Sequence, residues 1–182
     1  YYRSEGGDVG FDPEFGKLNM EERFRIHAKN ASMAMAYADA DRIVCPTPFQ
    51  ASVLPRAFQP KISVIHEGVD TDAIGPDPAA TFTLEDGRVL DRSTPVITFI
   101  NRNFERLRGF HIFMRALPAF LDAVPEAHVV AIGSDGSGYG GDRKDGKAWR
   151  QAMFDELGAR LDRRRVHFVV RVEHAQMIDI LS

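Results

Sequence analysis

The segment TPVITFINRNFERLRGFHIFMRA, residues 94–116, predicts a buried strand, a basic loop and a helix in succession. Its apolar run Pro95–Ile100 is short and rich in β-branched residues, as in a buried parallel strand. Apolar residues then recur at the spacing of one helix face, at Phe110, Phe113, Met114, Leu117 and Phe120. A strand that leads into a helix indicates an open α/β sheet, whose ligands bind at the carboxyl ends of the strands.

The loop between this strand and this helix carries three arginines, Arg102, Arg106 and Arg108, and ends at Gly109. Backbone N–H groups at the start of a helix attract anions, and a planar guanidinium can bind two phosphate oxygens at once. The segment therefore predicts a site for a phosphate or a diphosphate. The alternative is a solvated surface loop in which the arginines pair with Glu105 and other nearby acids.

The rest of the chain alternates between strand and helix patterns. A helix is expected over residues 20–38, capped by Asn19, and a short helix follows Thr47. Strands are expected at 41–45, 61–66, 127–132 and 165–170, a hairpin at 81–90, and further helices at 147–161 and from 174 onward. From residue 94 the order β-α-β-α-β-α predicts a parallel sheet with right-handed crossovers.

A stretch rich in proline and glycine, EGVDTDAIGPDP, begins at Glu67 and predicts a domain boundary. We expect the end of an N-terminal domain over residues 1–66, a linker over 67–80 and the first part of a second domain over 81–182. The chain starts at Tyr1 and stops at Ser182 within an amphipathic helical pattern, so a central piece of a longer protein is expected.

Composition and charge narrow the classes of protein to consider. Hydrophobic residues make up 44% of the chain and the net charge is −3, so a globular protein without a general attraction to nucleic acid is expected. No apolar run has the length of a membrane span. The single cysteine, Cys45, cannot form an internal disulfide, which fits a reducing compartment. The histidines lack metal-site spacing, and His66 and His111 are interpreted as structural.

Three glycines, Gly136, Gly138 and Gly141, match the dinucleotide-binding pattern G-x-G-x-x-G. They begin several residues after a predicted strand and end well before the next helix, and the following strand ends at Val170 rather than at an acidic residue. A flexible surface loop is the preferred interpretation, and an NAD-binding domain is the alternative. Gly133, directly at the strand end, is better placed for the close approach of a ligand.

Five segments together resemble the family 4 glycosyltransferases of the GT-B fold. In chain order they are ADRIVCPT (40–47), KISVIHEGVDT (61–71), FINRNFERLRGFHIFMRALP (99–118), VVAIGSDG (129–136) and RVHFVVRVEHAQMIDIL (165–181). The third segment is similar to the family's G-R-x-x-x-x-K-G donor loop, with Arg102 at the position of its arginine and Arg108 at that of its lysine.

The resemblance implies an α/β protein of the GT-B type, in which a truncated, Rossmann-like donor domain follows the end of a second Rossmann-like domain. It implies a retaining glycosyltransferase of the hexosyltransferase type that uses a nucleotide-sugar donor and needs no metal or other cofactor. Arg102, Arg108 and the helix start at Gly109 would bind the donor diphosphate. The nucleotide would be lined by Asn101, Gly133, Ser134, Arg171 and Val172.

Two positions depart from the family pattern, since Asn101 and Val170 stand where glycine is usual. The family's acidic E-x7-E motif is expected beyond Ser182, so no catalytic residue is assigned here and the fragment alone is expected to be inactive. The resemblance leaves a saccharide, a lipid or a small molecule as acceptor. It implies a cytoplasmic location, with the inner membrane surface as an alternative. A nucleotide-sugar epimerase of similar fold and a non-catalytic nucleotide-binding module remain as alternative functions.

Overall fold

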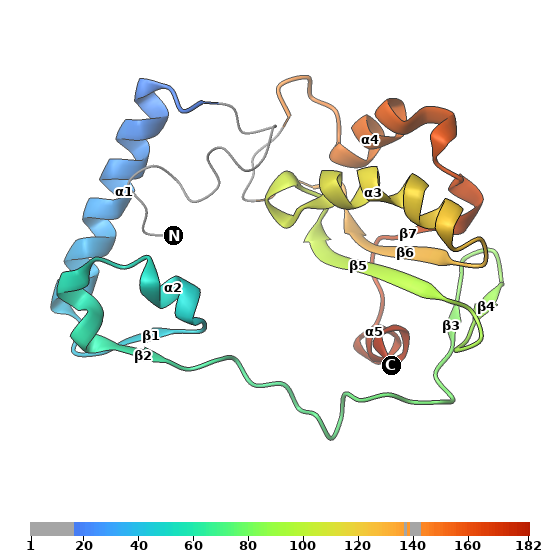
Figure 1. The fold of residues 1–182 in the computed structure, drawn as a ribbon, viewed down its shortest axis with the longest axis horizontal. Coiled ribbons are helices and arrows are strands. Elements are labelled where there is room, and N and C mark those ends of the chain that lie inside the picture. The colour runs from blue at the N-terminus through green and yellow to red at the C-terminus, as the bar shows by residue number, and fades with distance from the viewer. Residues whose placement is uncertain (1–16, 137, 139–142) are drawn as a thin grey trace. The chain divides into compact units, whose positions relative to one another are not determined.

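A computed structural model describes residues 17–136, 138 and 143–182 of the chain (Figure 1). The chain divides into two compact units between Val69 and Asp70. Each unit contains a parallel sheet and apolar side chains packed against it. Helices and parallel strands therefore give a mixed α/β protein, as the sequence predicts.

The first unit contains a long helix, a short helix and a two-stranded parallel sheet. Helix α1 spans Met20–Asp39, β1 spans Ile43–Cys45, α2 spans Pro48–Ser52, and β2 spans Ile62–Val64 after a 3₁₀ turn at Arg56–Lys61. The predicted cap at Asn19 is confirmed, because the Asn19 side chain accepts the backbone N–H of Glu22 at 2.8 Å. The Thr47 side chain likewise accepts the N–H of Gln50 at the start of α2.

The second unit is built on a three-stranded parallel sheet in the order β5-β6-β7. The strands are β5 (Val96–Asn103), β6 (His128–Ser134) and β7 (Val166–Val169). The helices are α3 (Phe110–Ala123), α4 (Trp149–Leu157) and α5 (His174–Leu181), and the hairpin strands are β3 (Phe82–Thr83) and β4 (Val89–Leu90). The strand and helix order predicted from residue 94 is therefore confirmed.

The two faces of this sheet are covered by different elements (Figure 1). Side chains of α3 and α4 pack on the face that includes Val129 and Ala131. The β3–β4 hairpin and Ile180 of α5 pack on the opposite face, which includes Val130 and Ile132. All four of these β6 side chains are buried, as expected for a central strand covered on both faces.

A β-bulge interrupts the pairing of β5 with β6. Ile100 pairs with Ile132 and Asn103 pairs with Ser134, so Asn101 and Arg102 together lie opposite Gly133. The extra residue reverses the alternation of side chains beyond it, and Phe104 consequently enters the core beneath α3, where it is 2% exposed. The sequence predicted that the strand ends at Ile100. It extends to Asn103 because the bulge lets pairing with β6 resume.

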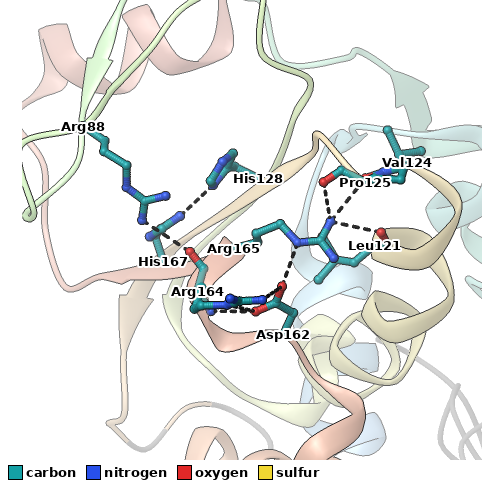
Figure 2. Close-up of polar contacts among 9 residues, drawn as sticks. All are labelled: Arg88, Leu121, Val124, Pro125, His128, Asp162, Arg164, Arg165 and His167. Atoms are coloured by element: carbon teal, nitrogen blue, oxygen red, sulfur yellow. Dashed lines mark hydrogen bonds and ion pairs between the residues drawn. The ribbon is translucent and has the colours of Figure 1, made fainter.

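An arginine binds the carboxyl end of α3 near the start of β7 (Figure 2). Arg165 Nη1 donates to the carbonyl oxygens of Leu121 at 3.0 Å and Pro125 at 2.9 Å. Its Nε donates to Asp162 at 3.1 Å. The last carbonyls of a helix have no partner within it, so this guanidinium stabilises the turn between α3 and β6.

Two histidines form a hydrogen-bonded pair at the same end of the sheet (Figure 2). His128 Nδ1 lies 3.0 Å from His167 Nε2, and the two rings stack with centroids 5.2 Å apart. Burial lowers the pKa of both imidazoles below the ordinary value of 6.5, and the nearby Arg88 guanidinium lowers both further. Asp86 opposes this effect at both rings, without reversing it.

We expect the free energy of unfolding to fall as the pH is lowered through 6.5, the ordinary histidine pKa. Below that pH the unfolded chain binds protons that the folded pair does not, so acid favours unfolding. Urea denaturation at about pH 7.5 and about pH 5.5 measures the change. A variant carrying both His128→Gln and His167→Gln should lose less stability over this interval, whereas the exposed His66→Gln should behave as the wild type. Equal losses in the double variant and the wild type would contradict the prediction.

Candidate functional site

The carboxyl ends of β5, β6 and β7 meet at one edge of the sheet, because the strands are parallel. Asn103 at the end of β5 pairs with Ser134 at the end of β6, and Ile132 of β6 pairs with Val169 at the end of β7. Every residue that the sequence assigns to a donor site lies at or just after one of these strand ends. This edge is where open α/β sheets bind ligands.

The arginine loop, residues 102–109, holds its cations at different depths. Arg102 and Arg108 are exposed, whereas Arg106 is half-buried in the 3₁₀ turn Arg106–Arg108. Among the residues that the structure describes, none forms an ion pair with Arg102. Arg108 Nε lies 3.7 Å from Glu105 Oε1, so the predicted alternative of pairing with Glu105 applies to Arg108. Five residues separate Arg102 from Arg108, one more than in the glycosyltransferase pattern.

Gly109 joins the 3₁₀ turn to the first turn of α3. Its φ is 74°, in the left-handed region that other residues rarely adopt. The Gly109 carbonyl accepts the N–H of Phe113 at 2.9 Å, so α3 begins immediately after it. The start of α3, with its positive end of the helix dipole, therefore lies directly after Arg108.

Gly133 lies against the bulge rather than in open space. A Cβ at this position would lie 2.5 Å from the Asn101 carbonyl oxygen and 3.0 Å from Phe104 Cε1. The absence of a side chain is therefore required by the neighbouring strand. The sequence interpretation of Gly133 rested on close approach by a ligand, and the structure supplies this second reason for glycine.

Ser134 joins the end of β6 to the bulge through hydrogen bonds. Its hydroxyl lies 3.1 Å from the Arg102 carbonyl oxygen and 2.6 Å from Asn103 Oδ1, and its own carbonyl accepts the N–H of Phe104 at 2.8 Å. These contacts fix the backbone on both sides of Arg102. The direction in which the Arg102 side chain leaves the sheet thus depends on Ser134.

The segment after β7 completes this edge. Arg171 is exposed, and Val172 packs against the apolar cluster beneath the β3–β4 hairpin. Val170 is 66% exposed, so its side chain extends into solvent at the position where the family usually has glycine. The backbone at 171–172 is therefore anchored by Val172, while the Arg171 side chain extends into solvent.

A further ion pair lies at the end of β6. Asp135, directly after the strand, binds Arg150 in the first turn of α4. The Arg150 guanidinium lies 5.3 Å from the ring centroid of Phe168 in β7. This contact links the ends of β6 and β7 through α4.

The glycine run after β6 does not form a strand-to-helix turn. Gly136 and Gly138 follow β6, whereas α4 begins only at Trp149, and Gly141 lies outside the described residues. His111 is fully buried against Trp149, with ring centroids 5.3 Å apart, which agrees with a structural interpretation.

Within the described ranges, no three His, Cys, Asp or Glu side chains gather as a metal site. No helix among those residues is both long and apolar enough to cross a membrane.

Sequence reasoning missed three parts of this edge: the bulge, the burial of Glu105 and the Asp135–Arg150 pair. Gly133 near the end of an otherwise apolar strand was a usable signal for the bulge, because glycine in a strand often marks one. The other two depend on contacts between distant parts of the chain, for which no local pattern exists.

Comparison with known proteins bears mainly on the first unit. Residues 1–74 match the model of a family described as "Glycosyl transferase family 4 group". A search of curated proteins finds no match to the chain. The predicted resemblance to family 4 glycosyltransferases is thus confirmed over residues 1–74, and the match ends before the arginine loop.

Proposed function

We propose that this chain, which is similar to family 4 glycosyltransferases over residues 1–74, is the central segment of a retaining enzyme of the GT-B type. Its first unit would form the C-terminal part of the acceptor-side domain, and its second unit would form the first part of the donor-side domain. The observation that carries the proposal is the sheet edge that carries Arg102, Arg108 and the start of α3. An edge with two exposed guanidinium groups and a helix start suits the diphosphate of a nucleotide-sugar.

The proposed role of the edge is to bind the donor and stabilise its leaving group. As the bond between the anomeric carbon and the diphosphate oxygen breaks, negative charge grows on the diphosphate. Arg102 and Arg108 would stabilise this charge, because Ser134 fixes the backbone at Arg102 and Glu105 lies against the Arg108 guanidinium. The backbone at Asn101, Gly133, Ser134 and 171–172 would line the nucleotide.

The donor site, the acceptor and the location follow from the same reading of the chain as a glycosyltransferase. The two arginines supply the positive charge that the departing diphosphate needs, so the donor site requires no metal. The acceptor would be a saccharide, a lipid or a small molecule, bound by the first unit and the sequence before it. Cys45, buried and without a disulfide, fits a reaction in the cytoplasm.

Removing either exposed arginine should weaken the binding of nucleoside diphosphates. Hydrogen bonds to charged groups contribute about 1.5–3 kcal/mol each, so Arg102→Ala and Arg108→Ala should each lower the affinity roughly 10- to 100-fold. Isothermal titration of the purified full-length protein with UDP, GDP, ADP and dTDP measures this affinity and identifies the preferred base.

The matched control is Arg164→Ala, an arginine whose side chain is 89% exposed beside Asp162, near the start of β7. It removes the same charge from the second unit without touching the candidate site and should leave the affinity unchanged. Unchanged affinity in both Arg102→Ala and Arg108→Ala would refute the site assignment.

A further inference from the structure

Glu105 is a buried carboxylate within the arginine loop. Its side chain is only 5% exposed, and buried carboxylates are rare unless a cation or hydrogen bonds hold them. Its backbone carbonyl accepts the N–H groups of Arg108 and Phe110, both at 3.3 Å. Glu105 therefore shapes the turn between β5 and α3 through its backbone and holds a negative charge inside that turn.

Arg108 forms an ion pair with this carboxylate. Its Nε lies 3.7 Å from Glu105 Oε1, while 53% of the Arg108 side chain remains exposed. The contact therefore involves Nε, the guanidinium nitrogen nearest the aliphatic part of the side chain. A ligand in solvent can still reach the rest of the guanidinium. A long arginine side chain on a surface loop would otherwise sample many rotamers.

Gly138, after β6, lies directly against the same carboxylate. A Cβ built at Gly138 would overlap the carboxylate carbon and both oxygens of Glu105. A side chain at residue 138 would therefore force the Glu105 carboxylate to move. This packing explains why residue 138 is glycine, without any need for a dinucleotide-binding pattern.

We infer that Glu105 is a positioning residue for donor binding: its buried carboxylate, packed against Gly138, orients Arg108 toward the diphosphate of a nucleotide-sugar. The inference rests on the proposed function. Glu105 does not touch the donor itself and acts through Arg108. Gly138 and Arg108 thereby meet at the same buried carboxylate.

The direction of the change in diphosphate affinity distinguishes a positioning role of Glu105 from a purely electrostatic effect of its charge. A carboxylate near a diphosphate repels it, so removing the charge of Glu105 by itself would tighten binding. If Glu105 holds Arg108 in place, its removal must weaken binding despite this repulsion. Glu105→Gln keeps the size of the side chain and removes only the charge.

The test is a double-mutant cycle on the full-length protein, with the best-binding nucleoside diphosphate as the probe. Glu105→Gln should lower the affinity about tenfold in the wild type and less than about twofold in an Arg108→Ala background, as expected for residues that act as a unit. Gly138→Ala should also lower the affinity, because it displaces the carboxylate without removing its charge. The controls are Glu126→Gln, an exposed glutamate before β6, and Gly75→Ala, where a Cβ meets its nearest atom at 3.7 Å.

The possible results separate the role of Glu105 from the presence of a diphosphate site. Tighter binding by Glu105→Gln, or an equal loss in both backgrounds, overturns the positioning role while leaving the diphosphate site intact. If Glu105→Gln does not fold, wild-type affinity in Gly138→Ala overturns it instead. Failure of the wild type to bind any nucleoside diphosphate overturns the proposed function and the inference together.

Discussion

Replacing Gly133 by alanine is expected to destabilise the second unit by about 3 kcal/mol, near the upper end of the range for overpacked interiors. The new Cβ would lie 2.5 Å from the Asn101 carbonyl oxygen and 3.0 Å from Phe104 Cε1. The first of these atoms belongs to the backbone of β5, so no rotamer change can relieve the contact. The bulge must move, and Arg102 must move with it. Urea denaturation measures the loss, and nucleoside diphosphate titration should show weaker binding.

Gly75→Ala is the matched control, because its Cβ would meet its nearest atom, the Thr71 carbonyl oxygen, at an ordinary 3.7 Å. This change should alter the free energy of unfolding by no more than about 0.5 kcal/mol. Wild-type stability in Gly133→Ala would show that β5 and β6 separate more easily than the structure indicates.

Replacing Phe104 by alanine is expected to destabilise the second unit by about 4 kcal/mol, within the range for large aromatic side chains removed from a core. Phe104 stacks on Phe110 with ring centroids 4.6 Å apart and meets Phe168 edge-to-face at 5.5 Å. The cavity would open directly beneath the arginine loop. We therefore also expect weaker nucleoside diphosphate binding at temperatures where the variant remains folded.

Two further variants isolate the contribution of the buried Phe104 ring to stability. Phe104→Leu keeps most of the buried volume and should recover more than half of the lost stability. Phe24→Ala removes the same aromatic ring from a position that is 73% exposed, and it should leave the stability of the second unit unchanged. Similar unfolding curves for Phe104→Ala and the wild type would contradict the assignment of Phe104 to the core.

Local patterns predicted most of the fold because the relevant interactions are local. The cap at Asn19 involves a residue three positions away, and the helix face of α3 repeats within one segment. The alternation of strands and helices from residue 94 was sufficient to predict the parallel sheet. Parallel pairing then places the strand ends together, so the position of the candidate site also followed from the sequence.

Contacts between distant segments explain what the sequence did not reveal. The bulge depends on the register of β5 against β6, and the histidine pair joins residues 39 positions apart. Glu105 looked like an ordinary surface acid of a charged loop, whereas Gly138 packs against it from the loop after β6. No property of Glu105 or its sequence neighbours indicates that burial.

The bulge at Asn101–Arg102 lets β5 lose a residue at this point without changing its core. Deleting one residue there would restore simple alternation along β5 and leave Phe104 on the face covered by α3, because the bulge holds one residue more than β6 opposite it. The exposed segment that follows Gly75 lies outside the sheets and can likewise gain or lose a residue without exchanging the faces of any strand. When this protein is aligned with others, a one-residue gap at Asn101 or after Gly75 therefore keeps the same side chains in the core, whereas a gap within residues 96–100 exchanges the two faces of β5.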